Sequence, residues 1–190
     1  MPTLRPLRDY DEHDVINLFS WSGAVPAYKG TMVKIASPSG FVASDDEPVE
    51  MFGAVGNAYA NTVSQRYRTS AQVTTCTSGS SGTKDIPLGM LLYDVREDDE
   101  NGEKLIFNPR KAAENDYVIS GQAVPVLTRG IVLYSGATLA SDTVTIGLDV
   151  YAAAAGELSV TAAHIEKSTK VGKVLGLKDA NNHMLLKIEL

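Results

Sequence analysis

The chain has 190 residues, of which 44% are hydrophobic, and its 23 Asp and Glu residues outnumber 17 Lys and Arg residues to give a formal net charge of −6. This balance excludes the nucleic-acid backbone as the main partner, because phosphate binding needs clustered cations. No uncharged run resembles a membrane-spanning helix of about 20 apolar residues, and the first residues lack the apolar stretch of a secretory signal. We therefore expect synthesis without export. The lone Cys76 excludes an internal disulfide and a cysteine zinc site, and we expect it to be a small buried filler.

Residues 1–27 are predicted to form an extended N-terminal arm. Pro2 and Pro6 restrict the backbone, while acidic residues ahead of residues 15–19 favour a short helix there, with a strand as the alternative. The apolar groups of the arm need a surface on which to dock. We expect the arm to leave the body and anchor the protein to a neighbouring subunit. Packing as the first strand of the body is the alternative.

Residues 28–190 carry the signals of a β-rich domain. Alternation at residues 31–35 predicts a half-buried strand, and residues 51–76 predict two more strands. Residues 37–40, 44–50 and 77–85 have the composition of turns and surface loops. Two hairpin-like units, at residues 86–107 and 171–190, both carry Gly-x-x-Leu ahead of an Asp- and Asn-rich turn. One helical turn is expected within residues 108–118.

The segment from Gly121 to Gly136 is an apolar ribbon around which the rest of the chain is expected to be arranged. Its β-branched and aromatic residues predict two short strands, with Arg129 and Gly130 at the bend between them. Pro125 cannot donate a hydrogen bond to a neighbouring strand. It therefore predicts either an edge strand or a bulge.

Residues 143–151 show the clearest alternation in the chain. Val144, Ile146, Leu148 and Val150 recur at every second position, so they are predicted to share one buried face of a strand. Together these segments predict eight to eleven strands and at most two short helices. The expected fold is all-β, a single β-barrel or β-sandwich domain.

Patterns that indicate catalysis are missing from the sequence. The three histidines, at positions 13, 164 and 183, lack the spacing of a metal site, and residues 79–82 lack the spacing of a nucleophile elbow. Carboxylates cluster at residues 45–47 and 97–100, where flanking Gly or Pro residues favour solvated loops over a glycosidase pair or a calcium site. We expect no enzymatic activity, no cofactor and no bound metal.

Five short motifs, taken in order, carry a resemblance to a known family. They are Lys29-Gly30-Thr31-Met32-Val33, Pro87-Leu88-Gly89-Met90-Leu91-Leu92, Val124-Pro125-Val126-Leu127-Thr128-Arg129-Gly130-Ile131-Val132, Gly156-Glu157-Leu158 and Val171-Gly172-Lys173-Val174-Leu175. In this order they resemble the head decoration, or capsid cement, proteins of tailed bacteriophages, over about residues 28–190. Those proteins are small all-β modules, commonly homo-oligomeric, that bind the outside of a capsid and clamp neighbouring major capsid subunits. The resemblance implies a virion protein on the capsid surface, assembled in the host cytoplasm. Its implied partners are the major capsid protein and further copies of itself, as a dimer or trimer.

Aromatic and arginine side chains usually dominate interface energy, so they guide the choice of interface residues. The predicted protein interface comprises Leu4, Arg5, Leu7, Arg8, Tyr10, Phe19, Trp21 and Arg129. A receptor- or carbohydrate-binding module of a tail fibre or spike is the alternative function. It requires an exposed aromatic platform, which the single tryptophan does not favour. An enzyme with paired carboxylates ranks third.

Overall fold

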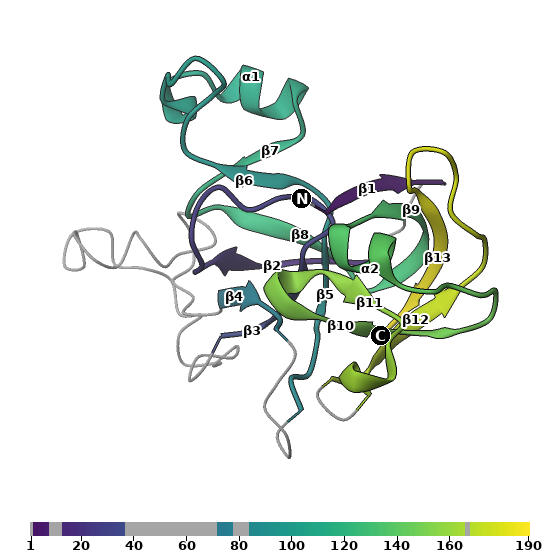
Figure 1. Ribbon diagram of the computed structural model, residues 1–190. Coiled ribbons are helices and arrows are strands. Elements are labelled where there is room, and N and C mark those ends of the chain that lie inside the picture. The colour runs from purple at the N-terminus through teal and green to yellow at the C-terminus, as the bar shows by residue number, and fades with distance from the viewer. Residues whose placement is uncertain (1, 8–12, 37–71, 78–83, 166–167) are drawn as a thin grey trace.

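The computed structural model describes residues 2–7, 13–36, 72–77, 84–165 and 168–190. Its strands form a closed barrel, a six-stranded sheet and a two-stranded ribbon, with two short α-helices beside them (Figure 1). The predicted all-β fold class is therefore confirmed. The predicted loops at 37–40 and 44–50, most of the loop at 77–85, and residues 51–71 of the segment expected to form two strands lie outside the described residues. The second of those two predicted strands is confirmed over residues 72–75.

Five strands close the barrel in the order β2 (Val15–Trp21), β4 (Gln72–Thr75), β3 (Met32–Ile35), β5 (Gly89–Leu91) and β8 (Ala123–Leu127). Neighbouring residues on these strands point to opposite sides. Val33, Leu91 and Val126 belong to one buried cluster together with Phe19 and Trp21. Their chain neighbours Met32, Met90 and Leu127 belong to a second buried cluster, which lies between the barrel and the six-stranded sheet.

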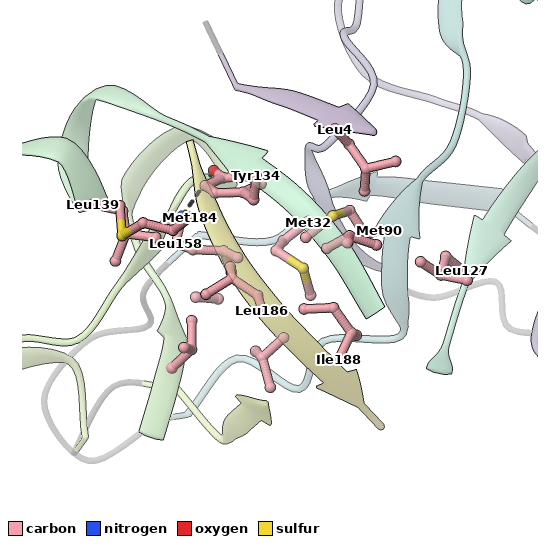
Figure 2. Packing of buried hydrophobic residues seen from close by; sticks show 14 of the residues in the cluster. Leu4, Met32, Met90, Leu127, Tyr134, Leu139, Leu158, Met184, Leu186 and Ile188 are labelled. Carbon is pink, nitrogen blue, oxygen red and sulfur yellow. Dashed lines mark hydrogen bonds between the residues drawn. The ribbon is translucent and has the colours of Figure 1, made fainter. Parts of the chain in front are cut away.

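The six-stranded sheet is antiparallel throughout, and its order brings the first strand beside the last third of the chain. In spatial order it contains β1 (Thr3–Pro6), β9 (Arg129–Ser135), β13 (Met184–Glu189), β12 (Lys170–Val174), β10 (Asp149–Ala152) and β11 (Leu158–Ser159). One face of this sheet supplies Leu4, Val132, Tyr134, Leu186 and Ile188, all at most 2% exposed, to the second cluster. Figure 2 shows these side chains, Val132 apart, meeting Met32, Met90 and Leu127 of the barrel.

A projection stands at the upper left of Figure 1, and its base packs on the barrel, because Val95 and Val118 belong to the buried cluster of Phe19 and Trp21. It contains β6 (Asp94–Arg96), the 3-10 turn η3 (Leu105–Phe107), α1 (Pro109–Glu114) and β7 (Tyr117–Ile119), with β6 and β7 paired in parallel. We call residues 94–120 the lobe. Pro109 at the start of α1 and the Asn108 side chain, which accepts from the Lys111 amide at 3.3 Å, explain why this predicted helical turn forms. The other short helical elements are α2 (Ala137–Ser141), η4 (Ala154–Gly156) and η5 (Ala162–His164).

The N-terminal segment differs from the expected separate arm. Thr3–Pro6 pairs with β9, and Val15–Trp21 is a barrel strand rather than a short helix. Leu4 is 2% exposed and lies in the cluster between the sheets. Both segments therefore pair with strands of the body through backbone hydrogen bonds. This is the alternative expectation, in which the segment packs as a strand of the body.

The predicted buried face at residues 144–150 is wrong at its centre, although Val144 at its start packs against the core. Val150 is buried in β10, but Ile146 is 65% exposed and Leu148 is exposed as well. The cause is a turn at Gly147, whose positive φ of 89° breaks the strand geometry that alternation requires. β10 therefore begins only at Asp149.

The central ribbon is two strands as predicted, but they do not form a hairpin. β8 belongs to the barrel and β9 to the six-stranded sheet, and Thr128 alone separates them, so the bend precedes Arg129. Pro125 lies on a strand paired on both sides, which excludes the edge-strand interpretation. The register of β2 shifts opposite Pro125, as the bulge interpretation requires. Of the two predicted hairpins, the C-terminal one is confirmed as β12 and β13. In the other, the expected second strand, Leu105–Phe107, is the 3-10 turn η3 instead.

Truncating a side chain between the two sheets should destabilise the whole fold. We expect Ile188→Ala to lower the free energy of unfolding by about 2–5 kcal/mol, because Ile188 is fully buried and its removal leaves a cavity. The matched control is Ile86→Ala, since Ile86 is largely exposed and the change should stay within about 0.5 kcal/mol. Urea denaturation of both variants measures the difference. Equal effects of the two changes would contradict the packing.

Candidate functional site

The described residues offer little machinery for chemistry. They contain no group of three or more His, Cys, Asp or Glu residues arranged to hold a metal ion. Burial raises the pKa of the Cys76 thiol to about 12, which keeps it protonated and fits the predicted role as a buried filler. No helix among them is long and apolar enough to cross a membrane. The surfaces of the sheet and of the lobe are therefore the features to consider.

The outer face of the six-stranded sheet is one candidate surface. Residues paired across neighbouring strands point to the same side, so pairing defines this face. One row runs through Arg5, Leu133 and Leu185, and the next runs from Ile131 through Lys187 and Lys173 to Asp149. Their neighbours along each strand fill the core, so these side chains point outward. We call this surface the docking face: Arg5, Leu7, Arg129, Ile131, Leu133, Asp149, Lys170, Lys173, Leu185, Lys187 and Glu189.

The docking face joins apolar and cationic groups. Ile131, Leu133 and Leu185 are partly exposed at its centre, and Leu7 is exposed at its edge, where the Leu7 amide donates to the carbonyl of Ile131 at 3.3 Å. Around them lie five cations, Arg5, Arg129, Lys170, Lys173 and Lys187, against two carboxylates, Asp149 and Glu189. This face is thus net positive on a chain whose net charge is −6.

Some of the charged side chains on the docking face form ion pairs with each other. Lys187 contacts Glu189 at 2.7 Å, and Lys170 contacts Asp149 at 2.9 Å. Lys173 lies directly opposite Lys187, a repulsive arrangement that the nearby carboxylates relieve. Arg5 forms no ion pair with any residue that the structure describes. Its guanidinium is therefore available to a carboxylate of a partner.

The lobe is the second candidate surface, and its acidic loop is more ordered than a solvated turn. The Asp99 side chain is only 1% exposed and contacts Lys111 Nζ at 2.5 Å. One of its oxygens accepts from the amides of Asn101 at 2.8 Å and Glu103 at 2.9 Å. These bonds lower the pKa of Asp99 to about 2, the Lys111 side chain being the largest cause. The prediction of a solvated loop is therefore wrong for Asp99.

Two exposed apolar side chains, Ile106 and Phe107, follow this loop, and we call them the tip of the lobe. Leu105 is buried beneath them, and its amide donates to the carbonyl of Glu97 at 2.9 Å. The next two residues, Ile106 and Phe107, are 65% and 86% exposed. Because the turn that carries them is anchored on both sides, these side chains are held out in a fixed position. Single exposed apolar residues are common on protein surfaces, and a contiguous patch is what marks an interaction site.

A groove separates the lobe from the barrel. One hollow of about 380 Å³ is lined by Trp21, Lys104, Ile106, Ile119 and Gly121, and it shares Glu97 and Ser120 with a second hollow of about 540 Å³. Arg96 lies in the second hollow, with its guanidinium carbon 4.6 Å from the centre of the Tyr117 ring and one nitrogen 3.1 Å from Asp94. The groove extends the apolar surface beside Ile106.

The predicted interface residues divide into three groups. Arg5, Leu7 and Arg129 lie on the docking face, where Arg129 Nε donates to the buried Asp14 carboxylate at 2.9 Å. Leu4, Phe19 and Trp21 are buried instead, because they are core residues of β1 and β2. Arg8 and Tyr10 lie outside the described residues.

Sequence reasoning missed several exposed residues that the structure brings forward. Leu133, Leu185 and Lys187 complete the docking face, and Ile106 and Phe107 form the tip. A signal for the docking face existed, because two strands of the sheet are apolar at consecutive positions and therefore on both sides. The tip gave no such signal, since its short apolar run was interpreted as half of a hairpin.

Acid should loosen the lobe in a defined range of pH. The folded pKa of Asp99, about 2, lies below its ordinary value of 3.8, so its stabilising contribution is complete above 3.8 and is lost as the pH falls through about 2. Both the Asn101 and the Glu103 amide donate to Asp99, so their protection against hydrogen exchange should decrease over the same range of pH. Asp99→Asn should weaken the protection above pH 3.8, where the original carboxyl is ionised, whereas Glu114→Gln, which removes an exposed partner of Arg110, should not. Full protection in Asp99→Asn would contradict this account.

Comparison with known proteins supplies no template for these surfaces: no family model matches the chain, and no similar protein was found among curated proteins or solved structures. Their interpretation therefore depends on the pairing, exposure and charge described above.

Proposed function

We propose that the chain is a structural virion protein that binds the outer capsid lattice of a tailed phage and stabilises it by clamping neighbouring major capsid subunits. The observation that carries this proposal is the docking face, an apolar centre bordered by cations on a chain of net charge −6. The order of the five family-like motifs along the sequence supports it independently.

The charge of the docking face favours an acidic protein surface as the partner. Arg5 and the lysines around Leu133 are suited to carboxylates at the rim of a contact, where opposite charges guide association and fix orientation. Leu133, Leu185 and Ile131 at the centre lose contact with water when a partner covers them, which contributes the hydrophobic part of binding.

The rigidity of the docking face also suits a clamp. β9 and β13 lie in the interior of the sheet, each paired on both sides, so their outward side chains start from an ordered backbone. Binding through an ordered surface loses less conformational entropy than binding through a loop that must first become ordered. A protein that ties neighbouring capsid subunits together benefits from such a surface, because its own shape then limits how far they move apart.

Charge reversal at Arg5 tests the proposal. Arg5→Glu should reduce co-sedimentation with expanded capsids of the encoding phage by about 10-fold or more, the effect of losing roughly 1.4 kcal/mol at the interface. Its thermal unfolding should stay close to that of the original chain, because the side chain is exposed. Arg110→Glu is the matched control, since the Arg110 side chain is 89% exposed, belongs to the lobe and changes the net charge equally. Capsid binding by the control should be unchanged.

Two outcomes would count against the proposal in different ways. Unchanged capsid binding by Arg5→Glu would reject the docking face as the contact. Failure of the original chain to bind capsids, together with binding to host cells or purified surface glycans, would support a tail-fibre or spike module instead.

A further inference from the structure

The groove between the lobe and the barrel has the chemistry of a binding site, and it is not part of the docking face. We propose that this groove binds an extended basic peptide segment of a partner protein, in which lysine or arginine side chains alternate with apolar ones. This contact is separate from capsid binding and does not rest on it. The lobe lies at the upper left of Figure 1, whereas β12 and β13 of the docking face lie at the right, so one molecule has room for both contacts.

The groove has the size and the lining of a ligand site. Its two hollows, of about 380 and 540 Å³, adjoin at Glu97 and Ser120, which line both. Hollows of roughly 300–1,000 Å³ with apolar walls and a few polar groups are typical of sites that bind ligands. The lining residues outside the lobe are all uncharged: Trp21, Gly23, Val25, Pro26 and Gly121.

The apolar wall of the groove is fixed before any ligand arrives. Trp21 Nε1 donates to the carbonyl of Ala24 at 3.0 Å, and Gly23 lies so close to the indole that a β-carbon there would be 2.6 Å from the ring. Ile106 and Ile119 of the lobe add to the apolar lining. Binding to a wall that is already ordered loses little conformational entropy.

The lobe side of the groove stays acidic after its ion pairs are counted. Residues 94–104, together with Lys111, which pairs with this loop, contain six acidic and three basic residues, a net charge of −3. Adding Lys29, whose amide donates to Asp94 at 2.8 Å, still leaves −2. The lining residues outside the lobe add no charge. A cationic ligand is therefore attracted to the groove, and an anionic ligand is repelled.

Glu97 is the group that an incoming cation would contact. It lines both hollows, its side chain is 54% exposed, and the ion pair that it forms with Lys104 spans 3.4 Å. Lys104 lies closer to Asp98, at 2.9 Å. The Glu97 carboxylate therefore keeps hydrogen-bonding capacity for an ammonium or guanidinium group of a ligand.

A peptide suits the groove better than a free amine. Alternate side chains of an extended segment point to opposite sides, so basic side chains can face the carboxylates while apolar ones face Trp21 and Pro26. In the larger hollow, Arg96 Nε is buried and finds no acceptor in the described part of the chain, while Nη2 of the same group donates to Asp94 at 3.1 Å. After a small movement of this side chain, a backbone carbonyl of the peptide can supply the missing acceptor.

Fluorescence of the full chain tests the proposal directly, because Trp21 is its only tryptophan and lines the groove. The probe is a blocked four-residue peptide in which leucine alternates with lysine. We expect a saturable change in Trp21 emission and a matching heat of binding in calorimetry, with a dissociation constant below about 1 mM. Added salt should weaken the binding, because it screens exposed charges. The same peptide with glutamate in place of lysine should not bind.

Two variants and their matched controls locate the site. Glu97→Gln should weaken binding of the lysine peptide about 3-fold or more, because an ion pair is lost, and Ile106→Ser should do the same, because an apolar contact is lost. Glu114→Gln and Ile86→Ser change the same residue types outside both hollows and should bind normally. All four variants should keep the original melting temperature, since these residues are more than half exposed.

Several results would overturn the proposal. They are the absence of saturable binding up to about 1 mM peptide, equal binding of the glutamate peptide, and unchanged binding by both Glu97→Gln and Ile106→Ser. Binding of the neutral sugar maltotetraose in place of the lysine peptide would identify a glycan site and overturn it as well. Arg5→Glu should bind the peptide normally, which separates this result from failure of capsid binding.

Discussion

The packing of the barrel against one face of the six-stranded sheet is the constraint on which the other surfaces depend. Thr128 is the single residue between β8 and β9, and both its amide, at 2.8 Å, and its hydroxyl, at 3.0 Å, donate to the carbonyl of Asp14. The last residue, Leu190, donates to the carbonyl of Thr128 at 3.1 Å, so the start, middle and end of the described chain meet at this junction. With one face of the sheet committed to the barrel, its other face, the docking face, stays partly exposed.

The sequence predicts the strands of this structure better than their partners. β-branched residues and turn signals identify β8 and β9, but nothing local indicates that the chain changes sheets at Thr128, because that change depends on which distant strands are free to pair. The same limit explains residues 143–150. Alternation of apolar residues indicates a strand only if every residue keeps extended geometry, and the positive φ of Gly147 interrupts it.

The candidate site was predicted only in part, because successive residues of a strand alternate between buried and exposed sides. Arg5 was correctly expected to be exposed, but a strand that exposes Arg5 must bury its neighbour Leu4, and the arm hypothesis treated both as surface residues. Phe19 and Trp21 are buried because their strand closes the barrel, a consequence of long-range pairing. Phe107 could not be predicted, since its exposure depends on a 3-10 turn, Leu105–Phe107, where a strand was expected.

The strand edges of the described structure indicate why contacts between chains would use side-chain surfaces rather than added strands. The barrel is closed and offers no edge. At one end of the six-stranded sheet, Gly30 packs so close to the backbone of β1 that a β-carbon there would lie 3.3 Å from Thr3. At the other end β11 has only two residues, and the Asp142 carboxylate accepts from the Val160 amide at 2.9 Å directly after it. With these edges short or covered, an incoming chain finds few free backbone groups, so the proposed contacts rely on outward side chains such as those of the docking face.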